Sequence, residues 1–323
     1  MDSARGSEKM RIASIDIGTN TLLLLVADID KNSRLDQVHH EQRFPRIGRD
    51  VDASGRISIG AFDRTSWILL EYINLARQLR SDVIVACATS AVRDAENKNE
   101  FLTYLEKTTS LQIQVLSAEA EAQLTYRGVT FGMSDERTPV AVLDIGGGST
   151  EMIMQERLRE GSSFQNMYLQ VGAVRITERF FTHDPPTAAE QMSARAFIRE
   201  IIAAKTLPSF ENIRLMGVAG TVTTLVCLER GLKQFIPEKV EGYHLSRQSI
   251  ESWSNRLASM SSGEILTLSE AAEGRSDILA AGAMILHEIM KTFNCGEIVA
   301  SIRGLRHGFA IVAWEELNRH STP

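Results

Sequence analysis

Apolar positions along the chain follow two spacings, one typical of strands and one typical of helices. Residues 11–16 and 21–27 form two apolar runs separated by a short turn with a glycine, which predicts a β-hairpin. Residues 36–44 predict a third strand, and apolar positions at helical spacing over 60–80 predict a long helix. After this helix, further strands and helices are expected to the end of the chain.

The rest of the pattern predicts further elements of both kinds. The strands are expected at 83–88, 111–116, 140–146, directly after the turn at 147–149, and at 167–170, 214–218 and 297–301. The helices are expected at 97–108, 118–131, 174–181, 188–205, after 219–221 as far as 230, and at 246–261, 276–293 and 304–317.

The opening pattern occurs twice. Val140-Ala-Val-Leu-Asp-Ile-Gly146 repeats Ile12-Ala-Ser-Ile-Asp-Ile-Gly18 at a distance of 128 residues. A repeat of this long period indicates a duplicated domain. We therefore expect an α/β protein with two related domains, 10–130 and 131–304, mixed sheets covered by helices and a cleft between the domains. The last helix, 305–318, is expected to pack back on the first domain.

Composition narrows the class of protein. A chain of 323 residues suggests about two domains, and its net charge of −6 argues against a nucleic-acid partner. Its three cysteines are far apart, which gives neither a disulfide framework nor a zinc site. The N-terminus has no signal pattern and no apolar run is long enough to span a bilayer. A cytoplasmic protein without a membrane partner is expected.

The second copy of the repeat continues as Asp144-Ile-Gly-Gly-Gly-Ser-Thr150. Gly146, Gly147 and Gly148 allow backbone N–H groups to converge on phosphate oxygens, and Ser149 and Thr150 add hydroxyl donors. Asp144 and Glu151 are carboxylates that would hold a divalent cation between protein and phosphate. A tight hairpin with structural glycines is the alternative for a single copy.

The first copy has a shorter version of the same loop. Asp16 is the weaker counterpart of the metal ligands, and Gly18, Thr19, Asn20 and Thr21 would contact phosphate oxygens. Neither loop has the Walker or the Rossmann spacing.

A third glycine turn joins a strand to a helix at Val218-Ala-Gly-Thr-Val-Thr-Thr224. Gly220 and Thr221 would bind an anion or a nucleotide at the helix N-terminus. Capping of the helix by Thr221 is the alternative.

These three segments resemble the phosphate 1, phosphate 2 and adenosine motifs of the actin-like ATPase superfamily. Within it, six ordered segments between Arg11 and Trp314 resemble the Ppx/GppA family of exopolyphosphatases and guanosine pentaphosphate phosphohydrolases. They are Thr89-Ser-Ala-Val-Arg-Asp-Ala95, Ser117-Ala-Glu-Ala-Glu-Ala122, Leu143-Asp-Ile-Gly-Gly-Gly-Ser-Thr-Glu151, Val171-Gly-Ala-Val-Arg175, Glu273-Gly-Arg-Ser-Asp-Ile278 and Leu305-Arg-His-Gly308.

The resemblance assigns the general base to Glu121. Spacing alone does not choose between Glu119 and Glu121, and both would be solvated helix glutamates without the family match. Arg93 follows a strand and a turn, where its guanidinium would stabilise charge on the terminal phosphoryl group. A salt bridge with Asp94 or Glu96 is the alternative for Arg93.

Four arginines lie close together around Gly48 and Gly55, at Arg43, Arg46, Arg49 and Arg56, and could bind a polyanion. Interleaved acidic residues favour a solvated loop as the alternative. Among these, Arg46 is the candidate substrate contact, although its loop reads Arg-Ile-Gly-Arg-Asp where the family pattern reads more like Arg-Leu-Gly-Glu-Gly. The chain ends at Pro323 without the C-terminal helical region of long family members, which argues against strong processivity on long polymers.

The resemblance predicts an exopolyphosphatase that releases orthophosphate from the end of inorganic polyphosphate. It implies Mg²⁺, with Mn²⁺ as an alternative and a monovalent cation in addition, and a homodimer. Removal of the terminal phosphate of guanosine pentaphosphate (pppGpp) or of a nucleoside triphosphate is the alternative activity. A small-molecule kinase and a non-catalytic nucleotide sensor are less favoured.

Overall fold

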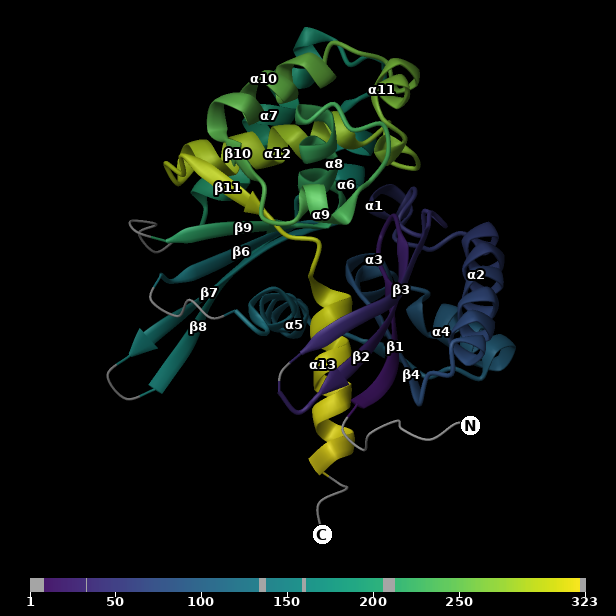
Figure 1. Ribbon diagram of the computed structural model, residues 1–323. Helices are drawn as coiled ribbons and strands as arrows, with labels where there is room; N and C mark the ends of the chain where they lie inside the picture. Colours follow the sequence, from purple (N-terminus) through teal and green to yellow (C-terminus); the bar gives the residue numbers. More distant parts are fainter. Residues whose placement is uncertain (1–8, 33, 134–137, 159–160, 206–212, 320–323) are drawn as a thin grey trace. The chain divides into compact units, whose positions relative to one another are not determined.

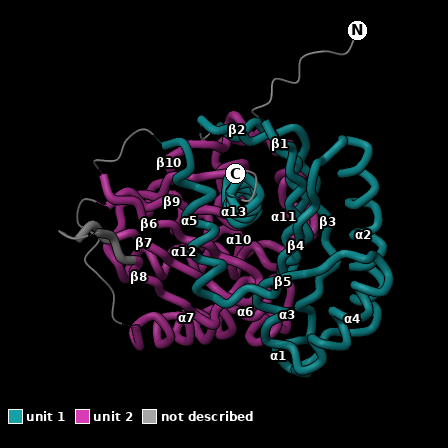
Figure 2. Tube along the Cα trace, turned by 90° about the horizontal axis from the view of Figure 1, so that it is seen from below, with its two compact units in different colours: residues 1–134, 303–323 teal, residues 135–302 magenta. Residues whose placement is uncertain are grey.

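A computed structural model describes residues 9–32, 34–133, 138–158, 161–205 and 213–319 (Figure 1). The chain divides into two compact units (Figure 2). Unit 1 contains residues 1–134 and 303–323, and unit 2 contains residues 135–302. Unit 1 is therefore discontinuous in sequence, because its last helix comes from the C-terminal end of the chain.

Unit 1 is built on a five-stranded mixed sheet with the strand order β3-β2-β1-β4-β5. Its strands are β1 (Lys9–Ile17), β2 (Leu22–Asp30), β3 (Leu35–Arg43), β4 (Val83–Ala88) and β5 (Ile113–Val115). Its helices are α1 (Val51–Ser54), α2 (Ile59–Gln78), α3 (Ser90–Asp94), α4 (Lys98–Thr109), α5 (Ala118–Thr130) and α13 (Leu305–Arg319).

Strands β1 and β2 of unit 1 bury both of their faces over most of their length. Alternation along β1 directs Ala13 and Ile15 into one apolar cluster with residues of α2 and α4. Ile12, the residue before Ala13, packs with Leu25 and with Ile311 of α13 on the other face. This explains the apolar run that opens β2, since a strand buried on both faces does not need to alternate with polar residues.

Helices α5 and α13 cross in direct backbone contact. A Cβ atom at Gly308 would collide with the carbonyl oxygen of Leu124, and one at Gly128 would collide with the carbonyl oxygen of Gly304. Larger residues at these two positions would force the helices apart, so the crossing depends on the two glycines.

Unit 2 repeats the architecture and extends it. Its sheet order, β8-β7-β6-β9-β11-β10, matches β3-β2-β1-β4-β5 with one strand added at the end. In both units the first three strands are antiparallel neighbours and the next two pairings are parallel. The predicted duplication is thus present in the topology.

The elements of unit 2 lie within residues 138–302. The strands are β6 (Val140–Ile145), β7 (Thr150–Leu158), β8 (Gly161–Leu169), β9 (Arg214–Val218), β10 (His244–Ser246) and β11 (Glu297–Ala300). The helices are α6 (Ala173–Phe180), α7 (Ala188–Ala203), α8 (Ala219–Glu229), α9 (Pro237–Val240), α10 (Arg247–Leu257), α11 (Ser262–Leu268), the 3-10 helix η1 (Glu270–Ala272) and α12 (Leu279–Thr292).

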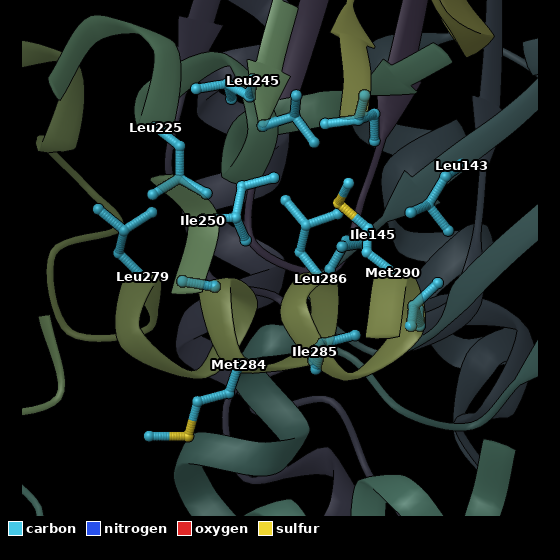
Figure 3. Packing of buried hydrophobic residues seen from close by; sticks show 14 of the residues in the cluster. Leu143, Ile145, Leu225, Leu245, Ile250, Leu279, Met284, Ile285, Leu286 and Met290 are labelled. Carbon is cyan, nitrogen blue, oxygen red and sulfur yellow. The ribbon is translucent and has the colours of Figure 1, made fainter. Parts of the chain in front are cut away.

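The core of unit 2 lies between one face of its sheet and its helices. Leu143 and Ile145 of β6 face Leu286 and Met290 of α12, and Leu225 of α8 lies in the same cluster (Figure 3). Every described residue of α12 is buried except its last two. A helix that is apolar on all sides is expected at the centre of a fold.

The predicted strands and helices are confirmed, with shifts at their ends. The strand expected at 167–170 is longer and begins at Gly161, because the polar stretch before it pairs with β7. The short elements α1, α3, α9, α11, η1 and β10 were not predicted, since three to seven residues carry too little periodicity. Within the described residues, no helix is both long and apolar enough to cross a membrane.

Candidate active site

The two Asp-Ile-Gly hairpins have the same turn. Gly18 N–H donates to the carbonyl of Thr21 at 3.0 Å, and Gly146 N–H donates to the carbonyl of Ser149 at 3.0 Å. The hairpins differ in the residue that lies opposite the aspartate of each Asp-Ile-Gly sequence. Asp144 lies directly opposite Glu151, whereas Asp16 lies opposite the apolar Leu23.

The start of α6 holds the second hairpin loop. The carbonyl oxygens of Gly146 and Gly147 accept hydrogen bonds from Ala173 N–H and Val174 N–H, both at 2.9 Å. The carbonyl of Gly148 accepts from the Arg175 Nε at 2.9 Å. We call residues 172–175 the bracing segment.

Three consecutive peptides of the loop are oriented by these bonds. In a trans peptide the C=O and N–H point in opposite directions. Because the carbonyls of Gly146, Gly147 and Gly148 face the bracing segment, the N–H groups that follow them face away from it. These N–H groups belong to Gly147, Gly148 and Ser149, and successive N–H groups on one side form an anion-binding concavity.

The first hairpin is held in the same way by the loop after β3. Gly48 N–H donates to the Thr19 carbonyl at 2.8 Å, and Arg46 N–H donates to the Asn20 carbonyl at 3.2 Å. The N–H groups of Asn20 and Thr21 therefore face away from this loop. In each unit, the segment after the third strand fixes the phosphate-type hairpin between the first two.

Asp144 and Glu151 form the candidate metal pair. Directly opposed residues of antiparallel strands lie on the same face, and two like charges there destabilise the sheet without a counter-charge. Glu151 is 3% exposed, which raises the cost of an uncompensated charge. Two carboxylates suit Mg²⁺, which commonly takes one or two carboxylates, water and substrate phosphate. The described residues contain no cluster of three or more His, Cys, Asp or Glu side chains suited to a metal.

The candidate base and the candidate arginine meet within unit 1. Arg93 Nη1 donates to Glu121 Oε2 at 2.7 Å and to the carbonyl of Leu116 at 3.0 Å. Ser117 caps α5 by accepting the Ala120 N–H at 3.1 Å, which sets the first turn that carries Glu121. Glu119 is exposed and pairs with Gln123 on the same helix.

Burial raises the pKa of the Glu121 carboxyl above its ordinary value, and the hydrogen bond from Arg93 opposes this rise. Asp94 raises the pKa of Glu121 further through its charge. A carboxylate with an elevated pKa is a stronger base than an exposed glutamate, which is the property that proton abstraction from water requires.

The charges of Asp16 and Glu121 act on buried groups of unit 1. Burial raises the pKa of the Cys87 thiol, and the charges of Asp16 and Glu121 raise it further. Burial lowers the pKa of Arg306, at the start of α13, to about 10, while the charge of Asp16 opposes this fall. Arg306, which belongs to the quoted motif Leu305-Arg-His-Gly308, therefore lies close enough to Asp16 for their charges to interact.

The remaining predicted contacts have varied surroundings. Thr19 and Ser149 are buried, and the hydroxyl of the fully buried Thr150 donates to the Val171 carbonyl at 2.6 Å. The Thr150 hydroxyl thus holds the residue that immediately precedes the bracing segment. In the third glycine turn, Gly220 lies against the guanidinium of Arg275, and Thr221 packs against Gly282.

The arginines at the end of β3 and in the segment that follows it are partly paired with acidic residues. Arg43 pairs with Glu41, Arg49 approaches Asp50 at 4.0 Å, and Arg56 pairs with Glu100 at 3.3 Å. Arg46 is half-buried and its backbone joins the first hairpin. The bracing role of this loop, like that of residues 172–175, was missed because backbone hydrogen bonds between distant segments leave no periodic signal.

Two units with the same mixed sheet, each with an Asp-Ile-Gly hairpin, define a protein of the actin-like ATPase class. Within this class, the model of the Ppx/GppA phosphatase family matches residues 25–317. The chain belongs to the Ppx/GppA phosphatase family and is a hydrolase.

Known relatives match nearly the whole chain. Exopolyphosphatase 2 of Mycobacterium tuberculosis is 32% identical over 294 residues, which cover 87% of this chain and 90% of the relative. The crystal structure of an exopolyphosphatase-like protein has a TM-score of 0.88 at 29% identity and covers 95% of this chain and 98% of that one. A Ppx/GppA family member from Aquifex aeolicus has a TM-score of 0.77 at 29% identity, with coverages of 98% and 100%.

Proposed function

We propose that the protein is an exopolyphosphatase that releases orthophosphate from the end of inorganic polyphosphate. The observation that carries the proposal is the buried Glu121 carboxylate, bonded to Arg93 at 2.7 Å on the capped first turn of α5. A kinase needs no base for water, whereas hydrolysis of a phosphoanhydride does. The names of the relatives from Mycobacterium tuberculosis and of the exopolyphosphatase-like structure support polyphosphate as the substrate.

In this proposal each predicted residue has a defined task. Glu121 orients the attacking water and accepts its proton, and Arg93 holds the carboxylate and stabilises charge on the phosphoryl group. The N–H groups of Gly147, Gly148 and Ser149 bind phosphate oxygens, and those of Asn20 and Thr21 do so in the first hairpin. Arg46 and the Gly220–Thr221 turn remain candidate substrate contacts.

Asp144 and Glu151 would hold Mg²⁺, with Asp16 as the weaker carboxylate of the first hairpin. When bound, the ion would neutralise phosphate charge and favour the departure of the leaving oxygen. Mn²⁺ prefers similar oxygen ligands and is expected to substitute in part. Cytoplasmic location and a homodimer are further proposals that follow from the family.

The test compares phosphate release from polyphosphate, guanosine pentaphosphate and ATP, with Mg²⁺ titrated. We expect polyphosphate to be hydrolysed fastest and Glu121→Gln to lower kcat by roughly 10² to 10⁴, the usual contribution of a general base. Glu119→Gln, two residues away on the exposed side of the same helix, is the matched control and should keep the rate.

Two results would contradict the proposal. Faster release from guanosine pentaphosphate than from polyphosphate would transfer the activity to the nucleotide. Full activity of Glu121→Gln would remove the assigned base, and melting temperatures of both variants show whether a lost rate reflects lost structure.

A further inference from the structure

The bracing segment carries a side chain to which no role has been assigned. Arg175 is half-buried at the start of α6, and its Nε donates to the Gly148 carbonyl at 2.9 Å. Its own backbone N–H also donates to the Gly147 carbonyl, at 3.1 Å. Arg175 therefore bonds two consecutive carbonyls of the glycine loop, one through the backbone and one through the side chain.

The conformation of the Gly146–Gly148 loop depends on the Arg175 hydrogen bond more than the conformation of an ordinary turn would. Three consecutive glycines lose more conformational entropy on ordering than other residues, so the loop is the part of the hairpin least able to hold its own geometry. Ala173 and Val174 fix the peptides after Gly146 and Gly147 through backbone bonds. The peptide between Gly148 and Ser149 has its carbonyl held by the Arg175 side chain.

The approach of the two segments is close. A Cβ at Gly172 would collide with the backbone of Gly147 and Gly148, so the bracing segment lies directly against the loop. Thr150 adds a bond from the strand side, through its hydroxyl to the Val171 carbonyl at 2.6 Å.

The first hairpin provides an internal comparison. Its two carbonyls are held by the backbone N–H groups of Arg46 and Gly48. The first loop has one glycine, Gly18, where the second has three. A side-chain brace thus occurs at the hairpin with the more mobile loop sequence and with the carboxylate pair.

We infer that Arg175 is a positioning residue for phosphate binding, acting through its Nε–H on the Gly148 carbonyl and not through its charge. The bond turns the Ser149 N–H toward the phosphate, so its loss weakens binding of the substrate chain. This inference rests on the proposed function for its kinetic consequences, while the brace itself can be tested without substrate.

Three substitutions separate the hydrogen bond from the charge. Arg175→Gln places an N–H donor at the same number of bonds from Cα as the Nε and removes the charge. Arg175→Met places a methyl group there, without donor or charge. Arg175→Lys keeps the charge and places a methylene there, with its amine one atom further out.

We expect Arg175→Met and Arg175→Lys to lose roughly three- to tenfold in kcat/KM for polyphosphate, as for one lost hydrogen bond whose strength does not depend on the charge of the donor. The loss should appear mainly as a higher KM, with a parallel rise in the inhibition constant of orthophosphate. Arg175→Gln should keep most of the wild-type kcat/KM. A charge role would give the opposite order, with lysine active and glutamine as impaired as methionine, and would overturn the inference.

Hydrogen exchange tests the brace independently of turnover. The amides of Ala173, Val174 and Arg175 donate to the loop and should exchange faster in the methionine and lysine variants than in wild type or the glutamine variant. Unchanged exchange in those two variants would overturn the inference even if activity fell. If wild type fails to hydrolyse polyphosphate, the proposed function fails while the exchange result still decides the brace.

Discussion

The pKa of Glu121, and with it the strength of the candidate base, depends on the charges of Arg93 and Asp94. Burial raises the pKa of Glu121, the hydrogen bond from Arg93 lowers it, and the charge of Asp94 raises it. A general base works only when deprotonated, so the pKa of Glu121 in the free enzyme sets the acid limb of kcat/KM.

Replacing Arg93 and replacing Asp94 should move the acid limb of kcat/KM in opposite directions. Arg93→Met removes the group that lowers the pKa of Glu121, so its acid limb should move to higher pH. Asp94→Asn removes a group that raises the pKa, so its limb should move to lower pH. The measurement is kcat/KM for polyphosphate against pH for wild type and both variants. Shifts in the same direction would show that a group other than Glu121 controls the limb.

At the level of elements, the crossing of α5 and α13 leaves no space for an added side chain at Gly308 or Gly128. Gly308 lies against the Leu124 carbonyl, with no room for a methyl group. Gly308→Ala should lower the free energy of unfolding by about 3 kcal/mol, because backbone on both sides cannot yield as a side chain can. Urea unfolding measures this loss.

The matched control is Gly263→Ala on α11, where an added Cβ meets no atom within 4 Å. Alanine is the better helix former, so this variant should be as stable as wild type or slightly more stable. A neutral Gly308→Ala would mean that the helices can separate at little cost.

Prediction from sequence succeeded where a long pattern specifies an element. The strand at Val83–Ala88 and the start of the helix at Ala118 were predicted at the observed residues. The site was harder, since spacing could not choose between Glu119 and Glu121, and only the fold buries one and exposes the other. Arg175 and Arg306 belonged to quoted motifs. However, Arg175 bonds Gly148 and the charge of Arg306 interacts with that of Asp16, and both interactions join segments that are far apart in the chain.

At the scale of the whole molecule, both ends of the chain belong to unit 1. Helix α13 covers Ile12 and Leu25 on one sheet face through Ala310 and Ile311, all fully buried. A chain that stops at residue 302 would expose this face. We expect it to aggregate or to lose the cooperative unfolding of unit 1, whereas a chain that stops at residue 319 should behave as wild type. Solubility and urea unfolding measure the difference, and a stable, cooperative 302-residue chain would contradict it.

The discontinuity of unit 1 also bears on synthesis at the ribosome. Residues 135–302 form a contiguous unit and leave the exit tunnel before α13 does. Strands β1 and β2 are made early and keep one apolar face uncovered until α13 has been synthesised. The second unit can therefore reach its native state before the first, reversing the usual N-to-C order of domain folding. Chaperones that bind nascent apolar strands would find their target on β1 and β2 throughout this interval.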